Sequence, residues 1–538
     1  MFFANKRDKV SLNLDNLESN LILNSIQGKE FFAEKEHFKA GDEEEAQKEY
    51  EKIENFIKTA KKNKNSIEEI KMYMSHFEDI RFSIKRAGSG ETLELHEFYE
   101  IKHFAFFYQK IFAVLKKLNI AEILCYSMEN LFAKLDPDKK NIPSFKISAN
   151  YSPELKATQE ELADLSRKRK NGMRLHFSRV EQETGLKNIG GKISVSRFQQ
   201  DMIRQLTESD YFVRESENFA NQTFSVKIPE HILAYDSKIT EKTEEIKKTE
   251  EKVRRELSSY IKSYRNDILR AYEKIGELDW LVCRFDFSEK YDCIIPKINK
   301  GKKIYLREAV NIPVSEHLEK SDINYQKQDL EIEKKVNIIT GANMGGKTTI
   351  LKTIGQIALL ASYAVPIPAK KAELPLFDFI FYSGYAVDTG KMDLSSFGEE
   401  VVQINKALEI SGRGLYLIDE LGRGTNPAEG DAFCRAVFEE FLSKEALMIA
   451  ATHFSRPSEI SEAGHFRIAG LKNLPENFEL SSQTESLQTG LKRLHEYMDY
   501  SLLKIEPNSE PPHDALRVAE LLGVNKNIIL KAKKILKK

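Results

Sequence analysis

The C-terminal half of the sequence contains glycine, lysine and threonine at the spacing of a phosphate-binding loop. The pattern GxxxxGK[ST] is met by Gly341, Gly346, Lys347 and Thr348, within the segment VNIITGANMGGKTTILKTIGQIALL. An apolar run precedes the motif and a helical run follows it, which is the strand, loop and helix context that such a loop requires. Glycines let backbone N–H groups surround phosphate oxygens, and the helix that follows points its positive end at them. A simple glycine turn would not need this context.

The motif also predicts roles for its residues. Lys347 is expected to reach the β- and γ-phosphates of a nucleoside triphosphate, both in binding and in catalysis. The Thr348 hydroxyl is expected to ligate Mg²⁺. The other candidate nucleotide contacts of the loop are Ala342, Met344, Gly345 and Thr349.

Two further segments supply polar groups at the ends of apolar runs. In GLYLIDELGRGT such a run leads into Asp419 and Glu420. Asp419 is expected to hold Mg²⁺ through water, and Glu420 to polarise the water that attacks the γ-phosphate. In ALMIAATHF the run leads to His453, whose side chain could sense the γ-phosphate. A lone histidine more often has a structural role, but its place at the end of the next strand favours a catalytic one.

The elements that must position these residues follow from the apolar pattern. Residues 12–135 predict amphipathic helices, with a connector near Gly88 to Gly90. Alternating β-branched residues predict short strands within 192–227. Residues 237–283 predict mostly one long helix, and a helix of about 40 residues would span about 60 Å. From about residue 336, apolar runs alternate with amphipathic segments, which predicts a mostly parallel sheet covered by helices.

The segments TGANMGGKTT, DELGRGT and ATHF, in this order and spacing, resemble the ATPase domain of the MutS mismatch-repair family. The segment FDFIFYSGYAVDTGKMDLSSFGEEV is similar to the one that carries the signature loop of that family. The resemblance implies ATP hydrolysis, with ATP and Mg²⁺ as cofactors and Asn343 in the phosphate loop. It also implies that Ser395, Ser396 and Phe397 face the nucleotide of a second subunit, so that a homodimer forms composite ATP sites.

The resemblance extends over most of the chain and predicts its organisation. The tail PHDALRVAELLGVNKNIILKAKKIL is similar to the C-terminal helices that embrace the partner subunit, while QETGL and GELDWLV resemble core, clamp and lever regions. The expected fold class is an α/β P-loop ATPase domain, a mostly parallel sheet with helices on both faces, following a mainly α-helical core and lever domain with a small, partly β clamp insertion. The expected division is 1–150 for the helical core and lever region, 151–285 for the clamp-like insertion and long lever helix, 286–490 for the P-loop ATPase domain and 491–538 for a C-terminal helical dimerisation segment.

The sequence departs from the mismatch-reading members of the family. We expect it to lack their N-terminal mismatch-recognition and connector domains, because lever-like helical sequence begins almost at once. A Phe-x-Glu wedge is suggested by Glu97, Phe98, Tyr99 and Glu100, but their place in an amphipathic helical run favours packing. Ala342 stands where mismatch-repair proteins carry Pro. This resembles divergent MutS-related ATPases, including the reactivating ATPase of a cobalamin-dependent lysine aminomutase.

Composition restricts the partners and the compartment. Lys and Arg total 82 against 83 Asp and Glu, so no global positive field attracts nucleic acid. The four cysteines are far apart and predict neither a zinc site nor a disulfide framework; they are Cys125, Cys283, Cys293 and Cys434. No stretch approaches the roughly 18 apolar residues of a membrane span, so a cytoplasmic protein without membrane contact is expected.

Two functions stay open at this point. In the first, the dimer binds double-stranded DNA in repair or recombination, and two basic patches contact phosphates. These patches are Arg167, Lys168, Arg169 and Lys170 with Arg174, and Lys247 and Lys248 with Arg254 and Arg255. In the second, ATP-driven motion remodels or reactivates a protein partner, and the same side chains are ordinary solvated helix charges. The resemblance favours DNA, whereas the balanced charge favours a protein. Contacts to adenine are expected within residues 322–325.

Overall fold

The computed structural model describes most of the chain in two compact units. The described residues are 4, 6–187, 190–341, 346–384, 396–422, 424–471, 496–507, 515–521 and 524–536. One unit joins Met1–Ser75 to Ile275–Lys538, and the other is formed by His76–Lys274. In the parts of the chain just given, no helix is long and apolar enough to cross a membrane.

The first unit begins with the helices α1 (Lys6–Ser11), α2 (Leu14–Ser19), α3 (Ile26–Glu34), α4 (Glu43–Lys62) and α5 (Lys64–Met74), and it also contains the second half of α12 (Arg265–Tyr291). Helices α3, α4 and α5 contact that half of α12. Buried Asp279 of α12 accepts hydrogen bonds from the backbone N–H groups of Asn24 and Ser25 and from the Ser25 hydroxyl. Its carboxylate therefore fixes the start of α3 on α12.

A small mixed sheet follows α12 in the same unit. Its strand order is β4-β8-β5-β6. The strands are β4 (Lys297–Asn299), β5 (Ile304–Ala309), β6 (Gln328–Ile332) and β8 (Lys371–Pro375), with α13 (Ile312–Glu319) between β5 and β6. This sheet carries none of the predicted chemical groups.

The second sheet of this unit has the order β13-β12-β7-β11-β10-β9. Its strands are β7 (Val336–Thr340), β9 (Phe379–Ser383), β10 (Gly414–Asp419), β11 (Leu447–Ala451), β12 (Gly464–Leu471) and β13 (Met498–Lys504). All neighbouring pairs are parallel except β12 with β13. Every residue of β7, β9 and β11 is buried, as expected for parallel strands covered on both faces.

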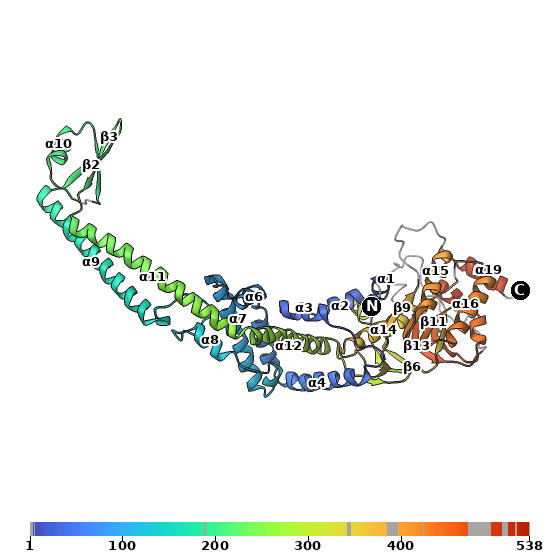
Figure 1. Cartoon of the computed structure of the whole chain (residues 1–538). Coiled ribbons are helices and arrows are strands. Elements are labelled where there is room, and N and C mark those ends of the chain that lie inside the picture. Colours follow the sequence, from blue (N-terminus) through green and yellow to red (C-terminus); the bar gives the residue numbers. More distant parts are fainter. Residues whose placement is uncertain are drawn as a thin grey trace. The chain divides into compact units, whose positions relative to one another are not determined.

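Helices lie on both sides of the six-stranded sheet (Figure 1). Successive side chains of β10 contact helices on opposite faces of the sheet. On one face, Leu417 packs against Gly355 of α14 (Lys347–Ser362). On the other, Tyr416 and Ile418 join a core with α15 (Ser396–Glu409) and α16 (Pro427–Leu442). The other helices among the described residues of the unit are η3 (Arg456–Glu459), α18 (Ala515–Leu521) and α19 (Lys526–Leu536). The predicted α/β domain with a mostly parallel sheet is confirmed.

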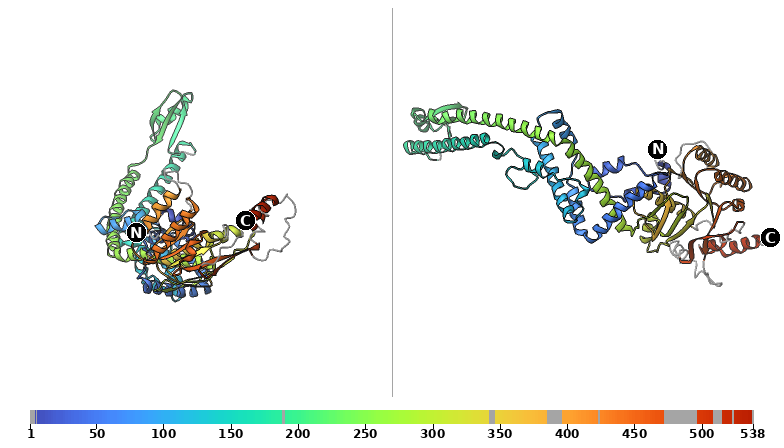
Figure 2. Two further views of the ribbon diagram at one scale, coloured as in Figure 1. Left: turned by 90° about the vertical axis from the view of Figure 1, so that its right-hand side faces the viewer. Right: turned by 60° about the horizontal axis from the view of Figure 1, so that its bottom comes forward.

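The second unit is mainly helical and includes a pair of long helices that lie side by side (Figure 2). The pair is α9 (Pro153–Thr184) and α11 (Glu230–Ser263), and the shorter helices are α6 (Arg81–Ser89), α7 (Leu95–Lys117), η1 (Ala121–Ile123), α8 (Glu129–Leu135) and η2 (Ala149–Tyr151). Residues between α9 and α11 form a small module: β1 (Lys192–Ser196), α10 (Gln200–Glu208), β2 (Phe212–Glu217) and β3 (Asn221–Val226), with the antiparallel order β1-β3-β2. The predicted partly β insertion is therefore present.

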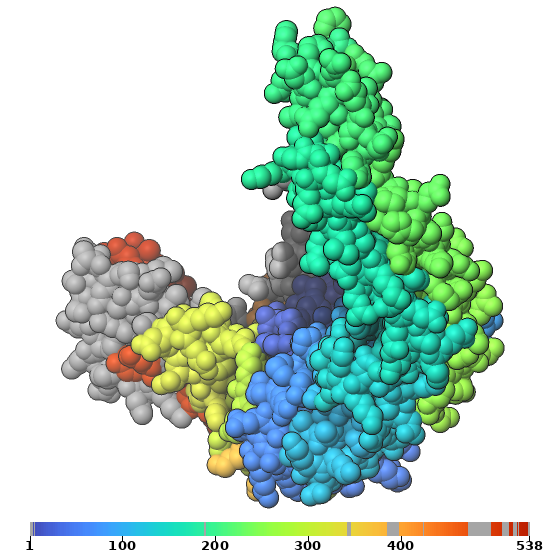
Figure 3. Space-filling view, turned by 90° about the vertical axis from the view of Figure 1, so that its left-hand side faces the viewer, coloured from blue at the N-terminus to red at the C-terminus, as the bar shows by residue number. Residues whose placement is uncertain are grey.

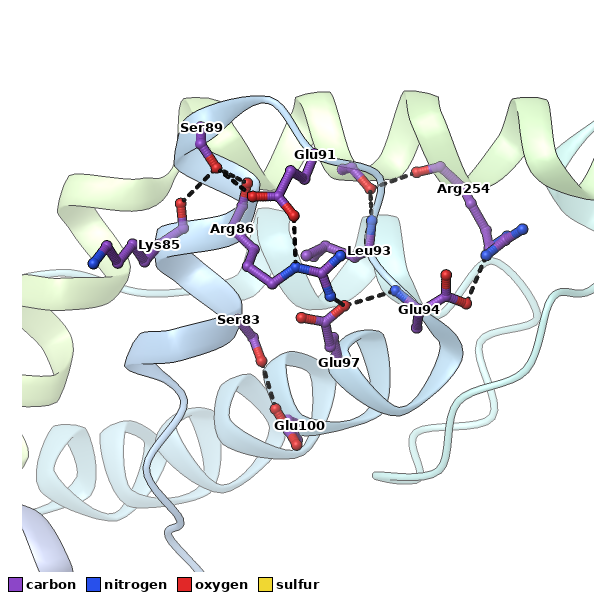
Figure 4. A network of polar contacts seen from close by, with 11 residues as sticks. Ser83, Lys85, Arg86, Ser89, Glu91, Leu93, Glu94, Glu97, Glu100 and Arg254 are labelled. Carbon is purple, nitrogen blue, oxygen red and sulfur yellow. Dashed lines mark hydrogen bonds and ion pairs between the residues drawn. The ribbon is translucent and has the colours of Figure 1, made fainter.

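A polar network joins α6, α7 and α11 within this unit (Figure 4). Arg86 pairs with Glu91 and with Glu97, whose side chain is only 1% exposed. Glu94 and Glu97 form a capping box at the start of α7, and Glu94 also pairs with Arg254 of α11. The Phe-x-Glu segment thus belongs to packing, because Phe98 is buried and the Glu100 carboxylate accepts the Ser83 hydroxyl.

The predicted single helix over residues 237–283 is wrong in one respect. It is divided at Tyr264, between the end of α11 at Ser263 and the start of α12 at Arg265. The Tyr264 N–H donates to the Ile261 carbonyl, three residues back, instead of continuing the four-residue ladder. This tighter turn interrupts the helix without Gly or Pro, so composition gave no indication of it.

Candidate functional site

The predicted phosphate loop connects β7 to α14 and is bounded by two glycines with positive φ. Gly341 has φ 144° and Gly346, the N-cap of α14, has φ 90°. A Cβ at Gly346 would lie 3.0 Å from the Tyr500 ring, so a side chain there would be both strained and crowded. Ala342, Asn343, Met344 and Gly345 lie outside the described residues.

Lys347 begins α14 with a side chain that is 4% exposed. Its Nζ donates to the Gly341 carbonyl at 2.6 Å and lies 3.7 Å from Oε1 of Glu420. The ammonium group therefore lies across the loop, between its first glycine and the end of β10. Thr349 follows on α14, and its carbonyl accepts a hydrogen bond from the Thr353 hydroxyl.

Thr348 and Asp419, the predicted Mg²⁺ ligands, are in direct contact. The Thr348 hydroxyl donates to Oδ2 of Asp419 at 2.7 Å, and the Tyr382 hydroxyl donates to the same oxygen at 3.3 Å. The other carboxylate oxygen, Oδ1, is buried and receives no hydrogen bond from a described residue. A hydroxyl and a carboxylate with a free lone pair form the kind of hard oxygen site that Mg²⁺ uses, so these residues fit the ion.

Burial is the largest influence on the Asp419 carboxyl, and it raises its pKa above the usual range. The neighbouring Glu420 carboxylate raises it too, while the hydrogen bonds from Thr348 and Tyr382 and the Lys347 charge lower it. The balance indicates a carboxylate that lacks compensating positive charge. A bound cation would supply that charge.

Glu420 has an unusual backbone conformation for its residue type. Its φ is 56°, in the left-handed region, while its N–H still donates to the Ala451 carbonyl of β11 at 2.9 Å. The residue thus leaves the strand immediately after Asp419. Non-glycine residues in this region cost free energy and gather at functional sites.

His453 lies beyond the end of β11, which separates β7 from β10 in the sheet. The Thr452 N–H donates to the Ile339 carbonyl, so the residues after β11 begin at the same sheet edge as the loop. The imidazole is exposed, and its ring centroid lies 4.4 Å from that of Phe454. Its role toward the γ-phosphate stays a prediction.

The signature-loop residues are described only in part. Ser395 lies outside the described residues, and Ser396 begins α15 without a described side chain. Phe397 packs edge-on against Phe433 of α16, with ring centroids 5.6 Å apart. Contact of these residues with a second subunit stays a prediction.

Comparison with known proteins decides the family. The family "MutS domain V" matches residues 337–538. This part of the chain belongs to the MutS family. The chain is 26% identical to the DNA mismatch repair protein MutS of Thermotoga neapolitana over 74% of this chain and 50% of the relative.

Proteins of a second kind in the family are equally similar. Endonuclease MutS2 of Aquifex aeolicus is 26% identical over 75% of this chain and 53% of its own length. Endonuclease MutS2 of Carboxydothermus hydrogenoformans is 26% identical over 84% of this chain and 54% of its own length. The chain spans about half the length of these curated relatives.

Several residues of this MutS-family site escaped the sequence analysis. Tyr382 lies one residue before the end of β9, in FIFYS, and its hydroxyl donates to Asp419. That hydroxyl is the only feature of this apolar run that could have indicated a functional residue. Glu400 of α15 accepts the Gly422 N–H at 2.8 Å, and its burial raises its pKa. Tyr500 of β13 lies against Gly346, and burial raises its pKa to about 12.

The segment expected to contact adenine precedes β6. The Tyr325 hydroxyl accepts the Asn311 N–H, and burial raises the pKa of that phenol. The next residue, Gln326, accepts the N–H of Tyr500 and donates to Asp499, which ties this segment to β13. The contact of residues 322–325 with adenine stays a prediction. The link to β13 connects this segment to Tyr500, whose ring lies against Gly346 of the loop.

Most cations of the two basic patches are already paired. Arg167 and Lys168 both bind Asp164, and Arg169 binds Asp236. In the second patch, Arg254 binds Glu94 and Arg255 binds Glu251. The remaining members, Lys170, Arg174, Lys247 and Lys248, have no ion-pair partner among the residues that the structure describes. This pairing weakens the field that either patch presents to a phosphate backbone.

Proposed function

We propose that this chain is an ATPase that binds ATP and Mg²⁺ at the carboxyl edge of the six-stranded sheet. The supporting observation is the 2.7 Å hydrogen bond between Thr348 and Asp419 beside the Lys347 ammonium. A hydroxyl and a carboxylate for the metal and an ammonium for the phosphates then converge at the start of one helix. Membership of the MutS family supports the same reaction.

Each residue has a distinct part in this proposal. Lys347 releases the Gly341 carbonyl and binds the β- and γ-phosphates. Thr348 and Asp419 hold Mg²⁺, which neutralises charge on the phosphates when bound. Glu420, at the free end of β10, orients the attacking water, and its left-handed backbone directs the side chain away from the strand. Ser395 and Ser396 of a second copy complete the site in a homodimer.

Two variants test these roles. Lys347→Ala is expected to abolish nucleotide binding or turnover, since the ammonium is the binding group for the phosphates. Glu420→Ala is expected to bind ATP normally but lose about 10² to 10⁴-fold in turnover. Binding is measured with a fluorescent ATP analogue, and turnover by phosphate release.

Lys370→Ala is the matched control, because its ammonium pairs with Glu308 on the exposed rim of the small sheet. Both activities should stay at the level of the unmodified protein in this variant. Normal steady-state turnover by Glu420→Ala would refute the role of Glu420.

We further propose that the ATPase acts on double-stranded DNA, because the relatives are named as DNA mismatch repair proteins and endonucleases. A protein partner is the second candidate, and the paired cations of both patches favour it. The salt dependence of duplex binding separates the two, since phosphate contacts weaken steeply with salt.

A further inference from the structure

One side chain reaches the nucleotide site from a strand that carries none of the motif residues. Tyr382 lies on β9, and its buried hydroxyl donates to Oδ2 of Asp419 at 3.3 Å. The same oxygen accepts the Thr348 hydroxyl at 2.7 Å. Tyr382 has no part in the proposed binding of phosphates, so its contact with the site runs through this carboxylate.

The phenol has room to reach Asp419 because the residue beside it is glycine. A Cβ at Gly384 would lie 2.5 Å from the Tyr382 hydroxyl oxygen and 2.7 Å from its Cζ, which is closer than real Cβ atoms approach. Gly384 does not have a left-handed φ, so its backbone conformation is open to other residues. The glycine is therefore needed for the position of the hydroxyl rather than for a turn.

The backbone of Tyr382 is held separately from its side chain. Among the described strands, β9 ends the order of the six-stranded sheet and pairs with β10 alone. The Tyr382 N–H donates to Oδ2 of Asp8 at 3.3 Å, and Asp8, on α1, is 2% exposed. Edge strands otherwise present N–H groups without partners. Helix α1 thus fixes the strand from which the phenol extends.

The two hydroxyl donors leave one oxygen of Asp419 for a cation. Both bind Oδ2, whereas Oδ1 is buried and receives no hydrogen bond from a described residue. Rotation about the last side-chain bond of aspartate is soft, so donors on one oxygen decide how the other is oriented. Thr348 is itself a proposed ligand of Mg²⁺. Tyr382 is the donor that can hold the carboxylate without binding the ion.

We propose that Tyr382 is a positioning residue of the Mg²⁺ site, whose hydroxyl holds Oδ2 of Asp419 and keeps Oδ1 available to the ion. The inference rests on the proposed ATPase function, because Mg²⁺ belongs to that function. Loss of a group that supports a metal ligand typically weakens metal binding by about 10 to 100-fold. The hydrogen bond of 3.3 Å is long, so we expect the lower end of this range, about tenfold.

Binding of a fluorescent ATP analogue to the full-length chain tests the proposal. All proteins carry Glu420→Ala, so that hydrolysis does not disturb the measurement. Raising Mg²⁺ at a fixed analogue concentration gives the Mg²⁺ affinity, and titrating the analogue in EDTA gives the metal-free nucleotide affinity. Tyr382→Phe, which removes only the hydroxyl, should weaken Mg²⁺ binding by about tenfold. Its metal-free nucleotide affinity should be unchanged, because Lys347 keeps its contacts with the phosphates.

Tyr416→Phe is the matched control. Tyr416 is buried on the neighbouring strand β10, and its hydroxyl donates to the Ala407 carbonyl at 3.0 Å. The control therefore loses a buried hydrogen bond of the same sheet without touching Asp419, and its Mg²⁺ affinity should stay at the parent level. A second control is Tyr235→Phe on α11, which belongs to the green part of the surface in Figure 3. Circular dichroism verifies that each variant is folded.

Gly384→Ala tests the same hydrogen bond while keeping the phenol. The added methyl group displaces the hydroxyl from Asp419, so Mg²⁺ affinity should fall to a similar extent as in Tyr382→Phe. The two substitutions combined should weaken Mg²⁺ binding no more than either alone, because both remove one shared interaction. Fully additive losses would show that the two residues do not act through one hydrogen bond, and would overturn the proposal.

Unchanged Mg²⁺ affinity in Tyr382→Phe overturns the positioning role but leaves the proposed function standing, since Mg²⁺-dependent nucleotide binding persists. An equal loss of Mg²⁺ affinity and of metal-free nucleotide affinity also overturns it, because the whole loop is then disturbed. A parent protein that binds no nucleotide, or binds it equally with and without Mg²⁺, refutes the proposed function and the positioning role together.

Discussion

At the scale of single residues, the two carboxylate oxygens of Asp419 have different surroundings. One of its oxygens accepts two hydroxyl hydrogen bonds, whereas the other is buried without a described donor. Such a carboxylate is costly in the nucleotide-free protein, because its charge is only partly compensated. The same arrangement makes it a good ligand for a hard cation.

If Asp419 holds Mg²⁺ as proposed, protons should compete with the ion at this carboxylate, because burial raises its pKa. Mg²⁺-dependent ATP binding should be constant above the raised pKa and weaken as pH falls through it, by about tenfold per pH unit. Calorimetric titration of the Glu420→Ala variant, which keeps Lys347, measures the affinity for ATP and Mg²⁺ at each pH. The expected slow turnover of this variant prevents hydrolysis from disturbing the measurement.

Asp419→Asn is the control for that titration. This variant should bind Mg²⁺ poorly at every pH, and its affinity for Mg²⁺ should not fall further as the pH is lowered. The pKa of Asp419 is raised in the folded state, so its contribution to stability is present at low pH and lost as pH rises through that pKa. The amide should therefore be at least as stable as the carboxylate at neutral pH, and a lower melting temperature would contradict the burial argument.

At the scale of elements, the crossing of α3 and α12 depends on two glycines. A Cβ at Gly28 would lie 2.2 Å from Oδ2 of Asp279, and one at Gly276 would lie 2.7 Å from the Gln27 carbonyl oxygen. Backbones can approach this closely only where no side chain intervenes. The glycines thus permit Asp279 to cap the start of α3.

Gly276→Ala gives a sharp test of this crossing. Helix propensity alone predicts that alanine stabilises α12 by about 1 kcal/mol. The contact with the Gln27 backbone predicts the opposite, a loss of about 1 to 3 kcal/mol from overpacking. Urea unfolding measures the sign, and Gly301→Ala is the control, because its nearest neighbour would be 3.5 Å away. A stabilised Gly276→Ala protein would contradict the close crossing.

At the scale of the whole molecule, the nearly equal numbers of positive and negative side chains weaken any long-range electrostatic attraction between the protein and DNA. Nine cations were assigned to the two basic patches, and five of them are paired with carboxylates. Four cations per copy then remain for phosphates. Any DNA contact by these patches must be correspondingly weak.

The salt dependence of duplex binding should reflect this count. With four free cations in a copy, the slope of log affinity against log salt should be no steeper than about −4 per copy. Asp164→Asn frees Arg167 and Lys168 and should steepen the slope by up to about 2 per copy. Fluorescence anisotropy with labelled duplex measures both values. Absence of binding at low salt would end the DNA hypothesis and favour a protein partner.

The sequence by itself determined what depends on neighbours along the chain. Glycine spacing identified both ends of the loop, and alternating apolar runs identified β7, α14, β10, α16 and β11 in their order. Local patterns suffice here because a strand buried on both faces and an amphipathic helix each have a characteristic composition. Asp419 was placed with Thr348 because both follow strands of one parallel sheet.

Only the tertiary structure decided which distant residues meet. Tyr382 contacts Asp419, Asp279 caps α3, and Glu94 pairs with Arg254, although each pair is far apart in the sequence. Such contacts arise when whole elements pack, so composition within a segment contains no record of them. The exposure of Phe198 and Phe219 has the same origin, because their pattern does not differ from that of the buried phenylalanines until the module has folded.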